Sequence, residues 1–239
     1  SKLATMRLAR SLAILLVLLA TAAIASQGIT FKRAPKQGDT VKYRIEMAFQ
    51  MWGEDVTYRS LLTEKVSLVE DNGNFMIETL QSEYKAAFGE EEVEVPAKDV
   101  PPTATVYGPT GSIVQVRGSL TNDAVYRMSN LGAVRFPDSP VALGGTWTSK
   151  VAADPKTGVQ EAVANYTLEG EEKIGEWECY RVKFDYKENA GSDPASAEGT
   201  VWIGKTDSIV AKYQAEWKNA PVSGLPNPIT VRVSYTREP

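Results

Sequence analysis

The sequence predicts a mainly β protein built on a single large curved antiparallel sheet, half-barrel or barrel-like, of about ten strands with one short helix. Three observations lead to this fold class. Apolar and polar residues alternate over most of the chain, as in strands with one buried and one solvated face. Eighteen Gly and thirteen Pro are spread singly, which suits many short elements joined by turns. No strand-helix-strand pattern recurs, so the strands are expected to pair as hairpins, and two packed sheets are the alternative.

The hairpin at residues 198–217 is the stretch that best shows this alternation. A short polar turn, Lys205-Thr206-Asp207-Ser208, separates its two strands. One predicted face of the second strand carries Ile209, Ala211, Tyr213, Ala215 and Trp217. The opposite face is polar, with Val210 as its apolar exception. The pattern is typical of a sheet with one buried face.

Residues 1–25 have the features of a signal peptide. Lys2, Arg7 and Arg10 precede an apolar run, and Ala23-Ile24-Ala25 fits the small-residue rule for cleavage. The apolar run is shorter than the roughly 20 residues that a spanning helix requires. We expect a signal-peptide helix that is cleaved near Ala25, so that the protein contacts the membrane only before cleavage; an uncleaved anchor is the alternative. No cysteine lies at the cleavage point, which predicts a periplasmic or extracellular protein that is not lipidated.

The remaining chain is predicted to fold as one domain. Residues 26–39 are polar and form a lead-in loop, and residues 40–239 form a single antiparallel β domain. Two similar segments, near residues 38–43 and 144–149, raise a duplication with halves 40–135 and 136–239 as an alternative reading.

Three long strands open the domain. Residues 40–52 alternate most clearly, and a second strand over 56–70 is expected to contain a bulge. The turn Asp71-Asn72-Gly73-Asn74 then leads into a third strand over 75–88, because Asn-Gly tolerates positive φ. Consecutive hairpins of this kind form a meander.

The short helix is expected over Leu120–Leu131. Thr121 or Asn122 is the N-cap candidate, and Gly132 follows the last turn. Its apolar stripe includes the predicted lid residues Ala124, Met128 and Leu131. Such a helix would plug one face or end of the sheet.

Composition excludes several classes of chemistry. The chain has no histidine, which removes Ser-His-Asp and Cys-His catalysis and His-ligated zinc. The single Cys179 forms neither an internal disulfide nor a Cys-rich metal site. A formal net charge of −4 without a basic patch disfavours nucleic acid. No phosphate loop, dinucleotide fingerprint or nucleophile motif occurs, so we assign no catalytic residue, metal ligand or cofactor.

The aromatic residues on the predicted strands suggest a different kind of site. If they line the concave side of a curved sheet, the cavity between them would be apolar and would hold an acyl chain or a similar ligand. The candidate ligand-binding residues are Tyr43, Met47, Phe49, Trp202, Tyr213 and Trp217. The alternative is that these side chains simply fill the core.

The second half also resembles known proteins. Phe136-Pro-Asp-Ser-Pro-Val-Ala-Leu-Gly-Gly-Thr-Trp147, then residues 166–182, then Gly199-Thr-Val-Trp-Ile-Gly204, is similar to the exported bacterial β-rich proteins of unknown function grouped as DUF6263-like. More remotely, the chain resembles the LolA- and LppX-like half-barrel envelope carriers of lipoproteins and lipids. That resemblance implies a hydrophobic concave surface closed by a helix. It supplies no catalytic residues.

Three hypotheses about function follow. The first is an exported non-catalytic protein of the bacterial envelope that binds or carries a lipid or other hydrophobic ligand in the concave face. The second is an envelope structural or interaction module with a fully packed core and another envelope protein as its partner. The third is a carboxylate-dependent hydrolase, which requires two acids converging in a cleft.

Overall fold

The computed structural model describes residues 28–94, 102–118 and 122–239, and the expected signal peptide lies outside these residues. The first half contains β1 (Thr40–Met51), β2 (Glu54–Val69), β3 (Phe75–Phe88), β4 (Glu91–Glu94), β5 (Thr103–Tyr107), β6 (Ile113–Arg117) and α2 (Asp123–Gly132). The second half contains β7 (Thr146–Val151), β8 (Ala162–Ile174), β9 (Trp177–Glu188), β10 (Ser196–Gly204), β11 (Val210–Ala220) and β12 (Ile229–Arg237).

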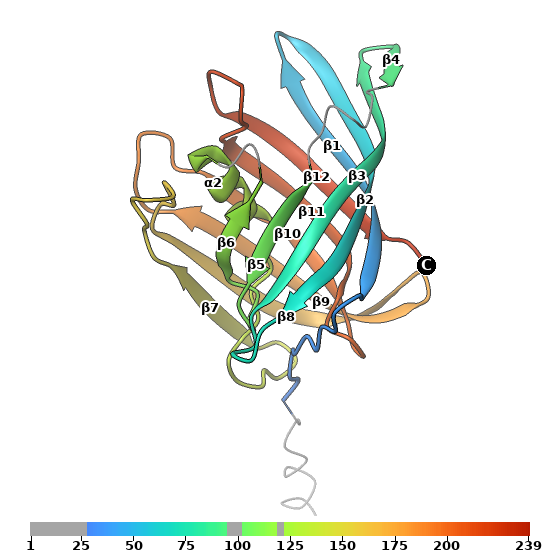
Figure 1. Ribbon diagram of the computed structural model, residues 1–239, viewed down its shortest axis with the longest axis vertical. Coiled ribbons are helices and arrows are strands. Elements are labelled where there is room, and N and C mark those ends of the chain that lie inside the picture. The colour runs from blue at the N-terminus through green and yellow to red at the C-terminus, as the bar shows by residue number, and fades with distance from the viewer. Residues whose placement is uncertain (1–27, 95–101, 119–121) are drawn as a thin grey trace, which may run out of the picture.

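All strands belong to one antiparallel sheet, which curls around a common interior (Figure 1). Its order is β6-β5-β3-β2-β1-β12-β11-β10-β9-β8-β7, with β4 paired to β3 beside this path. The path is not closed, because it ends at β6 on one side and β7 on the other. The predicted fold class is therefore confirmed, with 12 strands in place of about ten.

The two halves of the chain are joined in the sheet by its first and last strands. β1 pairs with β12 from Tyr43↔Arg237 to Phe49↔Val231, while β1 also pairs with β2 along its whole length. Every other neighbouring pair in the path, apart from β3 with β5, is consecutive in sequence. This single long-range pairing turns two meanders into one continuous sheet.

The concave face of β8–β12 is filled by side chains. The main core cluster includes Leu168, Val182, Phe184, Tyr213 and Val231, each at most 6% exposed. α2 lies on the concave side, where it contacts β6, β10 and β11 (Figure 1). In this half the interior is a packed core.

A series of ring contacts connects neighbouring strands across the interior. Tyr43 meets Tyr235 at 5.3 Å between ring centroids, and Tyr235 stacks on Tyr213 at 4.8 Å. Tyr213 meets Phe184 at 5.4 Å, although β10 lies between their strands. On β10, Gly199 pairs with Phe184 and with Ala215, and a Cβ added to it would lie 2.1 Å from the carbonyl oxygen of Gln214. The glycine thus permits close approach of the β10 and β11 backbones beside these rings.

A β-bulge corrects the predicted faces of the hairpin at residues 198–217. The register of β10 and β11 shifts between Trp202↔Lys212 and Ile203↔Val210. Val210 therefore packs against the main core, whereas Ala211 joins a separate cluster with Cys179 and Trp202. The sequence pattern placed Ala211 on the core face and Val210 on the polar face, which is the reverse of what is observed. The reason is the bulge, because one extra residue in a strand reverses the alternation beyond it.

α2 begins three residues later than predicted and ends at Gly132. The side chain of Asn122 caps it by accepting a hydrogen bond from the Val125 backbone N–H at 3.1 Å. Arg127 fixes the helix to the end of β9 through two hydrogen bonds to the carboxylate of Glu188, at 2.9 and 2.6 Å. Glu188 is 1% exposed, so the carboxylate of this ion pair is removed from solvent.

The β2–β3 pair offers a direct comparison of two tyrosines, Tyr84, which is buried, and Tyr58, which is half-buried. Among the described residues the Tyr84 hydroxyl has no hydrogen-bond partner, whereas the hydroxyl of Tyr58 donates to Gln81 at 3.0 Å. We expect Tyr84→Phe to stabilise the protein by about 1 kcal/mol, because it removes an unsatisfied buried group, and Tyr58→Phe to destabilise it by a similar amount. Urea unfolding of both variants tests this. Equal destabilisation by the two substitutions would contradict the assignment.

Candidate functional site

The residues before β1 form a strap across the base of the sheet. Ile29 forms an isolated antiparallel bridge with Val141. The backbone N–H of Lys32 donates to the hydroxyl of Ser208 at 3.0 Å, in the turn between β10 and β11. Gly38 then donates to the carbonyl of Val66 in β2 at 2.8 Å. These bonds hold the strap, residues 29–38, over the open end of the interior.

Phe31 anchors the strap in the core. Its ring stacks on Phe136 at 5.8 Å and contacts Trp147 at 5.6 Å and Tyr180 at 5.5 Å. The residue is 5% exposed. This segment was predicted only as a polar lead-in loop, and a lone Phe without periodicity gave no signal of burial.

Two adjoining cavities lie under the strap. The inner one, here called the chamber, has a volume of about 90 Å³ and lies between β1–β3, β5, β12 and the residues after α2. Its walls include Tyr43, Phe75, Ile77, Tyr107 and Tyr235. A single water needs roughly 10–15 Å³, so the chamber can hold several waters or a short apolar chain. Its lining combines five aromatic residues with the charged side chains of Arg33 and Glu64.

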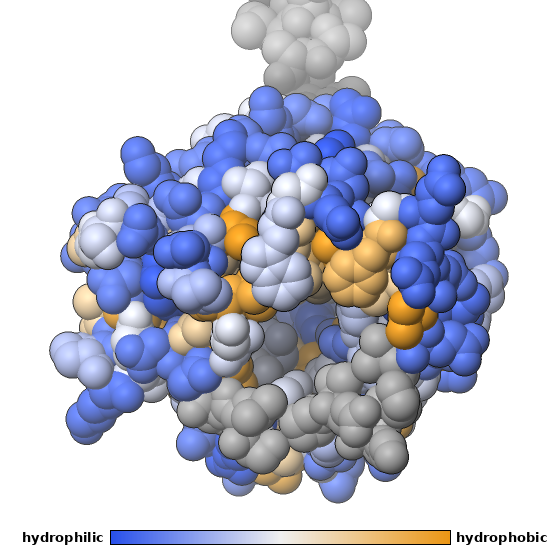
Figure 2. All heavy atoms as spheres, turned by 90° about the horizontal axis from the view of Figure 1, so that it is seen from above, coloured by the Kyte–Doolittle hydropathy of each residue, from blue (hydrophilic) through white to orange (hydrophobic). Residues whose placement is uncertain are grey.

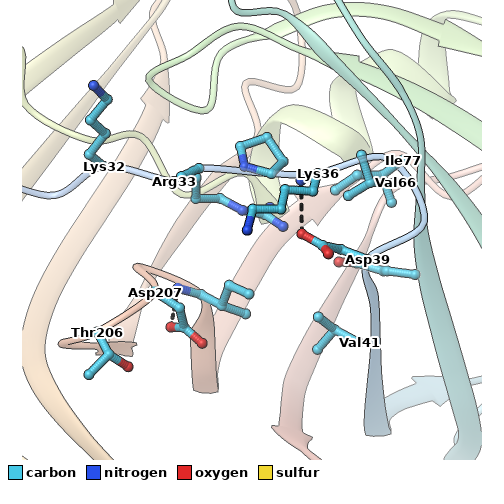
Figure 3. Close-up of a pocket in the computed structure, with 13 residues that line it drawn as sticks. Lys32, Arg33, Lys36, Asp39, Val41, Val66, Ile77, Thr206 and Asp207 are labelled. Carbon is cyan, nitrogen blue, oxygen red and sulfur yellow. Dashed lines mark hydrogen bonds between the residues drawn. The ribbon is translucent and has the colours of Figure 1, made fainter.

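The outer cavity, here called the vestibule, opens at the base and has a volume of about 270 Å³. Figure 3 shows the strap crossing it, with the side chains of Arg33 and Lys36 directed into the space and Lys32 directed away. Arg33 also lies over the ring of Phe75 at 5.0 Å. Arg33, Glu64 and Ile77 line both cavities and mark the boundary between them.

Glu64 is the unusual residue of this boundary. It sits on β2 opposite Val41 of β1 and Thr79 of β3, so its carboxyl points to the concave side. Burial raises the pKa of this carboxyl, and the nearby Arg33 partly opposes the rise. Within the part of the chain that the structure describes, the half-buried side chain of Glu64 forms no hydrogen bond or ion pair, and Arg33 acts on it only at longer range. A carboxyl that is partly removed from water without a hydrogen-bond partner costs stability unless something else contacts it.

The pKa of Glu64 leads to a prediction about stability. Because the folded protein holds this proton more tightly than the unfolded chain, the stabilisation is full below the ordinary pKa of glutamate and is lost as pH rises through the raised pKa. We expect Glu64→Gln to stabilise the protein by about 1–2 kcal/mol at neutral pH and by nothing at acidic pH. Denaturant unfolding at both pH values measures the difference. The exposed Glu78→Gln on β3 is the control and should show no such dependence.

The structure separates the ligand-binding residues predicted from sequence into three groups. Tyr43 lines the chamber. Tyr213 and Trp217 lie in the packed core, where the Trp217 indole donates to the Tyr213 hydroxyl at 2.9 Å. Met47 and Phe49 are half-buried beside that core. Trp202 lies away from all of these, with Cys179 and Ala211.

The predicted lid residues lie on or beside the packed core and do not line the chamber. Leu131 is 1% exposed, and its carbonyl accepts a hydrogen bond from Tyr213 at 3.4 Å. Met128 packs against the main core, and Ala124 is half-buried. In the described structure, the helix lies directly on the aromatic core without an intervening cavity at Trp217, whose ring is 3.3 Å from a Cβ built on Gly132.

Apart from Tyr43, the residues that line the chamber were not predicted as ligand-binding residues. Glu64 lies in a strand of mixed pattern, and Tyr107 and Tyr235 were ordinary members of predicted hairpins. A glutamate on the apolar side of a strand is a usable signal, but only once the bulges of β2 are known. Arg33 and Lys36 lie in irregular chain, where no periodicity reveals their direction.

The opposite end of the molecule has a different surface. Figure 2 shows that this end is hollowed at its centre, with apolar side chains set in a mostly hydrophilic rim. Trp52, at the tip of the β1–β2 hairpin, is 89% exposed. Across the described residues, none of the helices has the length and hydrophobicity needed to cross a bilayer.

Comparison with known proteins gives a distant structural likeness. No protein-family model matches the chain, and no curated protein sequence matches it. Among solved structures, it is similar to the hypothetical lipoprotein YmcC from Escherichia coli (K12), with 11% identity and a TM-score of 0.37 over 86% of this chain and 89% of that one. It is also similar to a putative exported protein with a YmcC-like fold from Bacteroides fragilis, with 11% identity and a TM-score of 0.38 over 87% of this chain and 98% of that one. These likenesses are too remote to assign a function, and the resemblance to DUF6263-like and LolA-like proteins is not confirmed by a family match.

Proposed function

We propose that this chain is an exported, non-catalytic binding protein that holds a small amphiphilic ligand in the chamber and vestibule. One observation carries the proposal. Glu64, Tyr43 and Tyr235 line a cavity with partly aromatic walls, yet neither the carboxyl nor the two hydroxyls forms a hydrogen bond with a described residue. Ligand sites commonly combine apolar walls with a few polar groups that fix orientation. Export is proposed from the signal-peptide pattern of residues 1–25.

The cavity volumes limit the size of the ligand. Pockets for drug-sized ligands measure roughly 300–1,000 Å³, and the chamber and vestibule, at about 90 and 270 Å³, lie at or below the lower end of that range. The site therefore suits a short apolar chain with a headgroup, and not a whole phospholipid. This narrows the lipid-carrier hypothesis drawn from sequence.

Blocking the chamber tests the proposal. Short amphiphiles with one hexyl chain and anionic, cationic or neutral headgroups are titrated into the purified protein by calorimetry. We expect at least one of them to bind, and Val210→Trp, which fills the chamber wall, to weaken that binding by about tenfold or more. The matched control is Val151→Trp, which lies in a different groove, between β6 and β7, and should bind as the wild type does. If no amphiphile binds, or both variants bind equally, the proposal fails.

A second function is favoured by the packing of β8–β12. There the interior is solid, and an exposed Trp52 and Leu143 remain on the surface as contacts for another protein. Under this hypothesis the chain is an envelope interaction module. Cross-linking in envelope extracts, with Trp52→Ser as the variant that loses the product, distinguishes it from a ligand carrier.

A further inference from the structure

The cations at the vestibule form no ion pair with the described residues. Lys32, Arg33 and Lys36 line this cavity; Arg33 lies over the ring of Phe75 and acts on the carboxyl of Glu64 only at longer range. Three positive charges within five residues of the strap would repel one another without a counter-charge. An anion from outside the protein would supply that counter-charge.

The acids near the vestibule do not fully balance the charge of its cations. Asp39 accepts the backbone N–H of Lys36 at 2.8 Å, as the dashed line in Figure 3 shows. Asp207 pairs with Arg237 at 2.7 Å and also accepts the backbone N–H of Ile209 at 2.9 Å. Burial raises the pKa of Glu64, and the nearby Arg33 opposes that rise. Three cations therefore face two acids that form no ion pair, Asp39 and Glu64, which leaves the lining of the vestibule with a net positive charge.

From this arrangement we infer that the ligand carries an anionic headgroup, a carboxylate or a phosphate, which Arg33 and Lys36 bind at the boundary of the two cavities. This inference rests on the proposed function and adds the chemistry of the headgroup. Arg presents several N–H donors that match carboxylate and phosphate oxygens, and Lys adds a point charge. Glu64 lies at the same boundary, where it can donate a hydrogen bond to the headgroup when it is protonated. The apolar chain then lies in the chamber against Phe75 and Ile77.

The affinity should depend on pH through Glu64. The titratable and charged groups that line the two cavities with it are Lys32, Arg33, Lys36, Asp39, Tyr43, Tyr107, Asp207 and Tyr235. Burial also raises the pKa of Tyr43, Tyr107 and Tyr235, so these hydroxyls stay protonated. As pH rises through the raised pKa of Glu64, its ionisation repels the anion and binding weakens. Glu64→Gln should bind the anion with little change over that pH range.

The decisive experiment compares headgroups on one chain. Hexyl phosphate, hexanoate, hexyltrimethylammonium and hexyl glucoside are titrated into wild type, Arg33→Met, Arg33→Lys and Lys42→Met, with melting temperatures recorded as a check on folding. We expect the two anions to bind about tenfold or more tightly than the others, and Arg33→Met to lose about that factor for the anions alone. Arg33→Lys should keep part of the affinity. Lys42→Met should behave as the wild type, because Lys42 is exposed on the face of β1 opposite Val41 and Tyr43.

The outcomes separate this inference from the function on which it rests. If the cationic or neutral amphiphile binds as tightly as the anions, the headgroup inference is overturned while the ligand-binding function stands. If none of the amphiphiles binds, the proposed function falls. Inorganic phosphate and acetate complete the series: binding as tight as that of hexyl phosphate or hexanoate would support the anion site and overturn the role of the chamber.

Discussion

Replacing Arg127 by Met is expected to destabilise the protein by about 3–5 kcal/mol, the cost of leaving a buried charge unpaired. The carboxylate of Glu188 is 1% exposed and receives both hydrogen bonds of the Arg127 guanidinium. It also accepts the backbone N–H of Ala195 at 2.7 Å, so it is fixed in place and cannot turn to water. Arg127 holds α2 against the end of β9. Its loss should therefore allow α2 to unfold before the sheet and lower the cooperativity of the unfolding transition. Urea unfolding measures the change.

Two further variants show whether the buried charge is the cause. Arg127→Met with Glu188→Gln should recover much of the lost stability, because glutamine can still accept from Ala195 and carries no charge. Lys218→Met removes an exposed ion pair to Glu198, in which both side chains are more than half exposed, and should cost no more than about 1 kcal/mol. Should Arg127→Met cost as little as Lys218→Met, the ion pair does not anchor the helix.

Phe31→Ala is the second large effect, with an expected loss of about 3–5 kcal/mol for removing a buried aromatic ring. The ring lies among Phe136, Trp147 and Tyr180 and is 5% exposed. Its removal leaves a cavity between the strap and the core. Because the strap carries Arg33 and Lys36, the variant should also weaken anion binding and speed hydrogen exchange at Lys32 and Gly38.

The control for this variant is Phe88→Ala. Phe88 ends β3 and is 37% exposed, so its truncation should cost far less stability than that of Phe31. Thermal and urea unfolding compare the two. If Phe31→Ala unfolds at the same denaturant concentration as the wild type, the strap is not packed into the core, and its cations have no fixed position over the vestibule.

The local structure of this chain could be predicted because apolar and polar residues alternate along most of its strands. The predicted strand over residues 75–88 coincides with β3, and the predicted polar turn at Lys205–Ser208 separates β10 from β11. Both depend only on neighbouring residues and on the two-residue period of a strand. The cap of α2 at Asn122 was likewise one of two local candidates.

The pairing of β1 with β12 and the position of the strap could not be predicted in the same way. They depend on contacts between residues almost two hundred positions apart, such as Tyr43↔Arg237. The bulge at Ala211 could not be predicted either. A single extra residue exchanged the faces of Val210 and Ala211, and nothing in the residue types at these positions indicates it.

The site was the least predictable feature. An apolar concave face was expected, and its predicted aromatic residues Tyr213 and Trp217 proved to lie under α2 in the core. The chamber instead combines one predicted residue, Tyr43, with Glu64 and Arg33, whose meeting depends on a strap without regular structure. Sequence alternation reports which strand face is buried, but not whether side chains or a cavity cover it.

The most direct test of this account is a crystal structure of the protein with bromohexanoate, in which the anomalous signal of bromine marks the end of the chain. We expect a bromine peak in the chamber beside Tyr43 and Tyr235, with the carboxylate within hydrogen-bonding distance of Arg33 and Glu64. A peak at another surface, or a chamber closed by its own side chains in the presence of the ligand, would contradict it.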